Sequence, residues 1–171
     1  MSRLQACFAR LQAEDRKALI PYIMTGDPHP EVTVPLMHAM VKAGANIIEL
    51  GAPFSDPMAD GPVIQAAAER ALEFHITMDD VFKAVKQFRR LDDVTPIVIM
   101  GYLNLIEVAG YGAFARLASE AGIDGVITVD MPPEEAHDYI SALEGESLDP
   151  VFLIAPTSTN ERIGKIGAVA S

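Results

Sequence analysis

The chain has 171 residues, half of them hydrophobic, and a formal net charge of -11. This length and hydrophobic fraction are sufficient for one domain with a proper core. The acidic balance, without a cluster of basic residues, argues against a protein that binds a nucleic-acid backbone. The single cysteine, Cys7, excludes an internal disulfide and is most simply a small buried hydrophobic residue. We therefore expect one cytoplasmic domain.

The chain starts with an amphipathic pattern. Ser2 followed by Gln5 is typical of a helix-capping box, and apolar residues keep helical spacing up to about Lys17. Acidic side chains and the lack of a long apolar run argue against a targeting segment, and no stretch of the chain approaches the ~20 apolar residues of a membrane helix. Residues 1–17 therefore predict a first helix.

Five short apolar segments follow, and each of them predicts a buried strand. They lie at residues 18–24, 46–50, 96–100, 125–129 and 150–154. Helical patterns alternate with them, at 32–44, 62–74, 77–88, 111–122, 133–143 and 161–171. Such alternation indicates a parallel sheet built from βαβ units and covered by helices. Two closures fit, an open doubly wound sheet or a (β/α)8 TIM barrel, and in both the function lies at the carboxyl ends of the strands.

Glu49 interrupts the second apolar segment. Side chains alternate along a strand, so if Ile48 and Leu50 face the covering helices, Glu49 faces the opposite side. An ionised carboxylate on that side is costly unless it is paired, and burial would raise its pKa toward the range of a general acid or base. Pairing with a lysine or arginine of a neighbouring strand is the alternative, although no predicted strand contains one.

Two aspartates, Asp56 and Asp60, lie in the loop that follows this strand. Three prolines, Pro53, Pro57 and Pro62, fix φ along the loop and stiffen it. The structural interpretation is that Asp60 caps the helix that follows; the functional one is that it accepts a hydrogen bond from a ligand N–H group. Both interpretations can hold together.

A second motif points to a different chemistry. Gly110, Gly112 and Ala115, followed by Asp130, match the spacing of a dinucleotide-binding fingerprint. That fingerprint needs a strand directly before the first glycine. A parallel connection needs about a dozen residues, so the segment 103–108 that follows the third strand is better interpreted as a short helix.

The remaining candidates are less specific. The four histidines lack the spacings of common metal sites, so no metal is predicted. Six residues at or near strand ends fit pocket lining and ordinary core filling equally well: Tyr22, Met100, Tyr102, Ile127, Val129 and Leu153.

The stretch IELGAPFSDPMADGPVIQ resembles the signature of the tryptophan synthase alpha chain family. Similarity continues in order along the chain in PYIMTGDP, MGYLN, AGIDGVITVDMPPEE and FLIAPTS, and so spans essentially every residue. The resemblance implies a (β/α)8 TIM barrel, of which this chain holds about five βα units after an N-terminal helix. It also implies that the glycine spacing from Gly110 is a coincidence.

For activity, the resemblance implies a lyase of tryptophan biosynthesis that cleaves indole-3-glycerol phosphate to indole and glyceraldehyde 3-phosphate. The catalytic residues implied are Glu49 as general acid and base and Asp60 as the group that holds the indole N–H. The six residues at the strand ends correspond to positions that sandwich the indole. No metal or cofactor is implied for this chain.

The resemblance also implies a partner protein, the pyridoxal-phosphate-dependent beta chain, in an α2β2 complex. The pyridoxal phosphate belongs to that chain. Three residues of this sequence match the face that docks it: Asp56, Asn104 and Pro132.

Length is the main departure from the family. A complete barrel takes about 250 residues, so three strands and the phosphate-binding loops are missing. We expect one incomplete barrel domain over residues 1–171, and a parent protein that continues beyond Ser171. Two alternatives remain: an inactive fragment that acts as a beta-chain-binding module, and a nucleotide-binding domain that uses residues 110–130.

Overall fold

The fold is one parallel sheet covered by helices, seen in a computed structural model that describes residues 2–170; the expected boundary at Ser171 lies outside them. The strands are β1 (Tyr22–Met24), β2 (Ile48–Gly51), β3 (Ile97–Tyr102), β4 (Gly125–Val129) and β5 (Asp149–Val151). Their order in the sheet is their order in the chain. An open doubly wound sheet would reverse this order at a switch point, so the topology is that of consecutive units of a barrel.

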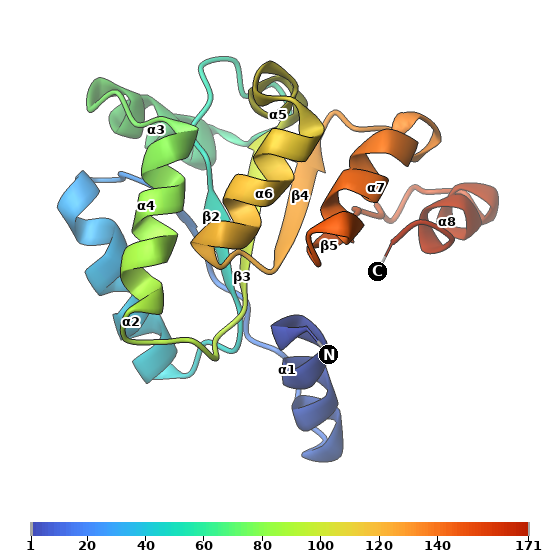
Figure 1. Ribbon diagram of the computed structural model, residues 1–171, viewed down its shortest axis with the longest axis horizontal. Coiled ribbons are helices and arrows are strands. Elements are labelled where there is room, and N and C mark those ends of the chain that lie inside the picture. The colour runs from blue at the N-terminus through green and yellow to red at the C-terminus, as the bar shows by residue number, and fades with distance from the viewer. Residues whose placement is uncertain (1, 171) are drawn as a thin grey trace.

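Helices connect the strands as the sequence predicts (Figure 1). They are α1 (Arg3–Ala13), α2 (Thr33–Ala43), α3 (Pro62–Glu73), α4 (Met78–Arg89), α5 (Leu103–Ala109), α6 (Tyr111–Ala121), α7 (His137–Gly145) and α8 (Asn160–Gly167). Two 3-10 turns, η1 (Pro30–Val32) and η2 (Pro133–Glu135), precede α2 and α7.

Local sequence signals set several helix ends. The predicted capping box forms at α1, where the Gln5 N–H donates to Ser2 Oγ at 3.2 Å and the Ser2 N–H donates to Gln5 Oε1 at 3.2 Å. α1 ends before the predicted Lys17 because the chain turns at Asp15, which has a φ of 50°. At the end of α2, Gly44 takes the left-handed conformation that a residue without Cβ adopts easily.

Two predicted strands are shorter than expected. β1 begins at Tyr22 and not at residue 18, and the preceding Leu19 and Ile20 are exposed. β5 ends at Val151, so Leu153 and Ile154 lie beyond the sheet. Pairing with β4 stops at Val151, and an apolar run in the sequence does not show where a strand at the edge loses its hydrogen-bonding neighbour.

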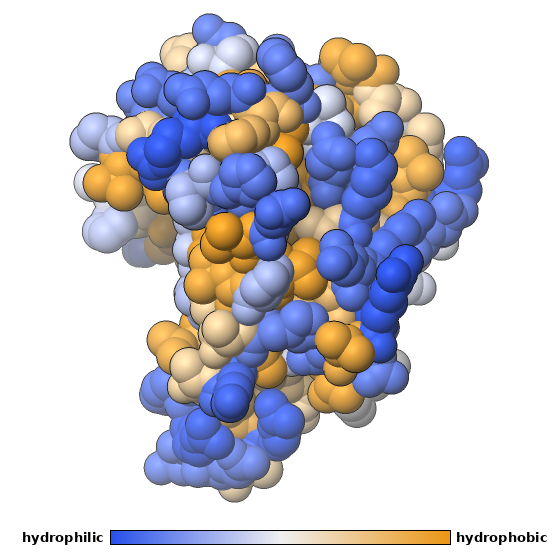
Figure 2. All heavy atoms as spheres, turned by 90° about the vertical axis from the view of Figure 1, so that its left-hand side faces the viewer, coloured by the Kyte–Doolittle hydropathy of each residue, from blue (hydrophilic) through white to orange (hydrophobic). Residues whose placement is uncertain are grey.

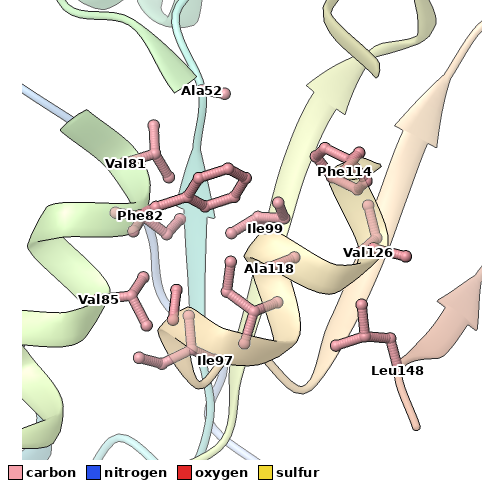
Figure 3. Packing of buried hydrophobic residues seen from close by; sticks show 14 of the residues in the cluster. Ala52, Val81, Phe82, Val85, Ile97, Ile99, Phe114, Ala118, Val126 and Leu148 are labelled. Atoms are coloured by element: carbon pink, nitrogen blue, oxygen red, sulfur yellow. The ribbon is translucent and has the colours of Figure 1, made fainter. Parts of the chain in front are cut away.

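The main core lies between the outer face of the sheet and the helices α2, α4, α6 and α7 (Figures 1 and 3). Ile48 and Leu50 are completely buried there, as the alternation along β2 predicts. Figure 3 shows the Phe82 ring of α4 directed toward Ile99 of β3, with Ala118 of α6 nearby. Burial of these side chains fixes which face of each strand points away from the helices.

α1 packs against the other face of the sheet, which we call the inner face. Its buried residues, Leu4, Cys7 and Leu11, contact Ile47, Val98 and Ile127. Cys7 is 5% exposed, which confirms its interpretation as a buried hydrophobic residue. α1 therefore covers part of the inner face of the sheet.

Apolar side chains also reach the surface. Figure 2 shows one face of the molecule, on which hydrophobic residues gather in the middle and hydrophilic residues border them. Exposed apolar residues include Phe8 of α1 and Leu153 beyond β5. Within residues 2–170, none of the helices has the length and hydropathy required to cross a membrane.

A buried ion cluster joins the elements at the amino ends of the strands. Asp124 is only 4% exposed and accepts hydrogen bonds from Arg3 at 2.9 Å, from Arg89 at 2.8 Å and from the Ile97 N–H at 2.8 Å. The Arg89 guanidinium also donates to the carbonyl of Gly122 at 2.8 Å. Asp124 thus links α1, α4 and β3 to the start of β4.

We predict that Asp124→Ala lowers the free energy of unfolding by about 3–5 kcal/mol, because it leaves the Arg89 guanidinium buried without its counterion. Urea unfolding measures the change. The matched control is Glu120→Ala on the exposed side of α6, expected to change stability by less than about 0.5 kcal/mol. Equal losses in the two variants would contradict this account of the cluster.

Candidate active site

The register of the sheet brings the predicted site residues onto the inner face. Tyr22 of β1 is paired with Glu49 of β2, which is paired with Val98 of β3. One layer further along the strands, Met100 is paired with Ile127. Paired residues of parallel strands point to the same side, so Glu49 lies on the inner face as the alternation predicts.

Glu49 is a half-buried carboxylate in apolar surroundings. It lines a cavity of about 530 Å³ between α1 and the inner face, whose wall includes Ile47, Val98 and Ile127. Burial raises the pKa of Glu49 above its ordinary value. Among residues 2–170, no ion pair or hydrogen bond to its carboxylate is formed, so the structure does not support the alternative of a structural salt bridge.

Asp60 lies at the end of the loop after β2, directly before the N-cap residue Gly61 of α3. The N-cap residue is Gly61, and no side chain accepts a hydrogen bond from the N–H groups at this cap. The structural interpretation of Asp60 as the cap is therefore wrong. Burial raises the pKa of Asp60, and a hydrogen bond from the Tyr102 hydroxyl opposes that rise. Tyr102 of β3 therefore favours the ionised form of Asp60, while burial, the larger effect, opposes it.

Tyr22 is influenced by both carboxylates. Its pKa is raised well above the ordinary value, first by burial and then by the negative charges of Asp60 and Glu49. The phenol lies so close to Gly51 that any side chain at that position would collide with it. Tyr22 thus lies near both acids, which shows that they belong to one region of the inner face.

A second cavity opens at the carboxyl ends of the strands. It has a volume of about 250 Å³, and Asp60 lines it together with four of the predicted pocket residues: Met100, Ile127, Val129 and Leu153. Ile127 and Val151 line both this cavity and the one at Glu49. The two carboxylates therefore border neighbouring hollows that share apolar walls.

Tyr102 has a different environment from the four predicted pocket residues that line the cavity at Asp60. It is 3% exposed, and like Tyr22 it lines neither of the two cavities. Its ring stacks on Phe54 with 5.0 Å between centroids, and its hydroxyl accepts a hydrogen bond from the Ala59 N–H at 3.0 Å. Little of its surface is left for a ligand, and its contacts are instead with the loop that carries Asp60.

Two polar residues near this region are absent from the sequence predictions. Gln65 of α3 donates from Nε2 to the carbonyls of Asp60 and Pro57, and Arg162 of α8 lines the cavity at Asp60. Gln65 follows the prolines closely in the sequence, where a first-turn side chain can reach back toward the loop. Nothing in the sequence around Arg162 indicates that α8 approaches the site.

The three residues predicted to dock a partner follow three neighbouring strands. Asp56 is exposed in the loop after β2, and its Oδ2 accepts a hydrogen bond from Ser55 Oγ at 2.6 Å. Asn104 is exposed in the first turn of α5, after β3, and Pro132 is half-buried before η2, after β4. All three lie at the carboxyl-terminal edge of the sheet.

The structure excludes the dinucleotide-binding context of Gly110. The residue follows α5, confirming the predicted short helix at 103–108, and it starts α6 with a φ of 78°. A dinucleotide fingerprint needs a strand in place of α5, so that a phosphate can meet the helix at the edge of the sheet. The spacing from Gly110 to Asp130 is therefore coincidental.

The fold and the acidic inner face define a class, the α/β barrels, whose sites lie at the carboxyl ends of parallel strands. The chain matches the sequence profile of the family "Tryptophan synthase alpha chain" over residues 8–171. It belongs to this family. It is 59% identical to the tryptophan synthase alpha chain of Thioalkalivibrio sulfidiphilus (strain HL-EbGR7) and 58% identical to that of Marinobacter nauticus (strain ATCC 700491 / DSM 11845 / VT8), over all of its own length.

Solved structures agree with this assignment. The alpha subunit of tryptophan synthase from Legionella pneumophila str. Paris superposes with a TM-score of 0.97 at 51% identity and covers 99% of the chain. The tryptophan synthase a2b2 complex of Pyrococcus furiosus matches 90% of the chain with a TM-score of 0.86 at 40% identity. The chain spans 64% and 63% of the two curated relatives and 65% of each of these two structures.

We predict that Glu49→Gln stabilises the chain relative to wild type as the pH rises. The raised pKa means that the folded state holds the Glu49 proton more tightly than the unfolded state. The stability from this group is complete below its unfolded pKa, roughly 4.3, and is lost as the pH rises through the raised folded value. Glutamine does not ionise, so it avoids this loss.

Urea unfolding at about pH 4 and about pH 7 tests this sign. The difference between variant and wild type should grow toward pH 7, whereas Glu120→Gln on the exposed side of α6 should give a constant difference. A Glu49→Gln variant that loses stability relative to wild type as the pH rises would show that a counterion stabilises the carboxylate.

Proposed function

We propose that the protein is a lyase of tryptophan biosynthesis in the cytoplasm, which cleaves indole-3-glycerol phosphate to indole and glyceraldehyde 3-phosphate. Membership of the tryptophan synthase alpha chain family supports the reaction class. The observation that carries the proposal is the pair Glu49 and Asp60, two carboxylates with raised pKa values that border neighbouring apolar cavities.

Glu49 is proposed to move protons. Cleavage of the carbon–carbon bond requires a proton on the indole ring carbon, which makes the ring electron-poor, and loss of the proton from the neighbouring glycerol hydroxyl. The bond then breaks, its electron pair returns to the ring, and the hydroxyl-bearing carbon becomes the aldehyde. A carboxyl group with a raised pKa is suited to both transfers because it exists in both protonation states nearer to neutral pH.

Asp60 is proposed to stabilise the charge that develops in the ring. Protonation of the ring carbon leaves positive charge at the indole nitrogen, and an ionised carboxylate that accepts the N–H hydrogen bond stabilises it. The cavity at Asp60 has the apolar walls that a flat aromatic ring requires, from Met100, Ile127 and Val129. Burial raises the pKa of Asp60, and the Tyr102 hydroxyl offsets part of that rise in favour of the ionised form that this role requires.

A partner chain is part of the proposal. The a2b2 complex of the Pyrococcus furiosus relative supports assembly with a tryptophan synthase beta chain, which would hold the pyridoxal phosphate and consume the indole. Asp56, Asn104 and Pro132 lie at the carboxyl-terminal edge where the indole forms, so a chain docked there would receive it directly.

We predict that the chain, with a beta chain added, releases indole from indole-3-glycerol phosphate. Glu49→Gln should reduce kcat at least about 100-fold, since it removes the proton-transfer group. Asp60→Asn should reduce it about 100- to 1000-fold through lost charge stabilisation. The measurement is a continuous assay of indole formation, with Glu120→Gln as the control that retains wild-type turnover.

Folded wild-type chain without turnover would contradict the catalytic proposal and leave beta-chain binding as its function. Turnover that survives Glu49→Gln would contradict the role of Glu49 specifically.

We further predict that Asn104→Arg weakens binding to a beta chain about tenfold or more, because a bulky cation at an interface centre displaces packed groups. Isothermal titration calorimetry measures the affinity. Gln87→Arg adds the same charge on the exposed side of α4 and should bind as wild type does. If wild type, Asn104→Arg and Gln87→Arg bind the beta chain with equal affinity, the docking face does not include Asn104.

A further inference from the structure

Gln65 forms contacts that link α3 to the loop in front of it. Its Nε2 donates to the carbonyl of Asp60 at 2.8 Å and to the carbonyl of Pro57 at 3.3 Å. The Asp60 N–H donates to the same Pro57 carbonyl at 3.1 Å. One side-chain amide therefore joins both ends of the turn formed by residues 57–60.

The chemistry of these contacts requires a donor. Both partners are carbonyl oxygens, which only accept hydrogen bonds, and a terminal amide nitrogen carries two N–H groups. A glutamate of the same shape would place oxygen against oxygen. The half-buried Gln65 is anchored by its own backbone, because its N–H donates to the Gly61 carbonyl at 3.0 Å as part of the first turn of α3.

A second contact holds the same turn from the sheet. The Ala59 N–H donates to the Tyr102 hydroxyl at 3.0 Å, and Tyr102 is fixed in turn by its stacking on Phe54. The turn is thus held from α3 at its two ends and from β3 in its middle. The backbone of the turn therefore has contacts with both elements.

We propose that Gln65 is a positioning residue for Asp60: its amide fixes the turn of residues 57–60, and the turn directs the Asp60 carboxylate into the cavity with Met100 and Ile127. The functional part of this inference rests on the proposed role of Asp60 in holding an indole N–H. The structural part, that Gln65 fixes the turn, is independent of it.

Three variants at position 65 distinguish the effect of the hydrogen-bond donor from the effect of the side-chain shape. Gln65→Met keeps the length and removes both N–H groups. Gln65→Glu keeps the shape and turns the donor into an acceptor, so it should disturb the turn more strongly. Gln65→Lys restores a donor and should recover wild-type behaviour in part. Gln87→Met is the matched control on the exposed side of α4.

Amide hydrogen exchange tests the structural part. In Gln65→Met and Gln65→Glu, the amides of Ala59 and Asp60 should exchange at least about tenfold faster, whereas the amide of residue 65 should keep its protection within α3. The same rates as in wild type would overturn the inference. Loss of protection along the whole of α3 would also overturn it, because Gln65 would then stabilise the helix and not the turn.

Indole binding tests the functional part. The chain contains no tryptophan, so excitation at wavelengths that indole absorbs and tyrosine does not makes the fluorescence report the added indole. Gln65→Met should weaken indole binding about tenfold, and Gln65→Lys should recover part of the loss. If Gln65→Met speeds amide exchange in the turn but binds indole with wild-type affinity, Gln65 does not act as a positioning residue. If wild type does not bind indole, the proposed function fails, and the exchange rates still decide whether Gln65 fixes the turn.

Discussion

The site depends on one unpaired carboxylate. Glu49 is half-buried among apolar residues, and within residues 2–170 no cation lies close enough to form an ion pair with it. Such a group costs folding energy when ionised, which is the physical meaning of its raised pKa. The same cost makes the Glu49 carboxyl group hold its proton to a higher pH than an exposed glutamate does. The alternation along β2 makes this placement unavoidable, because Ile48 and Leu50 must face the helices.

Stability and chemistry occupy opposite ends of the sheet. At the amino ends of the strands, the buried Asp124 joins α1, α4, β3 and β4 through Arg3, Arg89 and the Ile97 amide. At the carboxyl ends, Asp60 lies on a turn that is linked to α3 by Gln65 and to β3 by Tyr102. Because contacts at the amino ends of the strands stabilise the fold, the loops at the carboxyl ends can hold the acidic residues without being needed for stability.

Local patterns in the sequence predict the strands, the capping signals and the inward direction of Glu49, because each depends on near neighbours. The shortened β5 and the exposure of Leu153 depend on pairing with β4, which the sequence does not display. Tyr102 fits an indole-lining position by resemblance, yet its contacts are with Phe54 and Ala59, and only the folded loop shows this. The sequence does not predict the contacts of Gln65 either, because its partners are backbone carbonyls of the folded turn.

Glu49 is proposed to exchange a proton with the ring carbon of indole. The most direct measurement is deuterium incorporation at that carbon when indole is incubated with the chain in D₂O and followed by proton NMR. We expect wild type to accelerate the incorporation and Glu49→Gln to be at least about 100-fold slower. Equal rates for the two proteins would show that Glu49 is not the proton-transfer group.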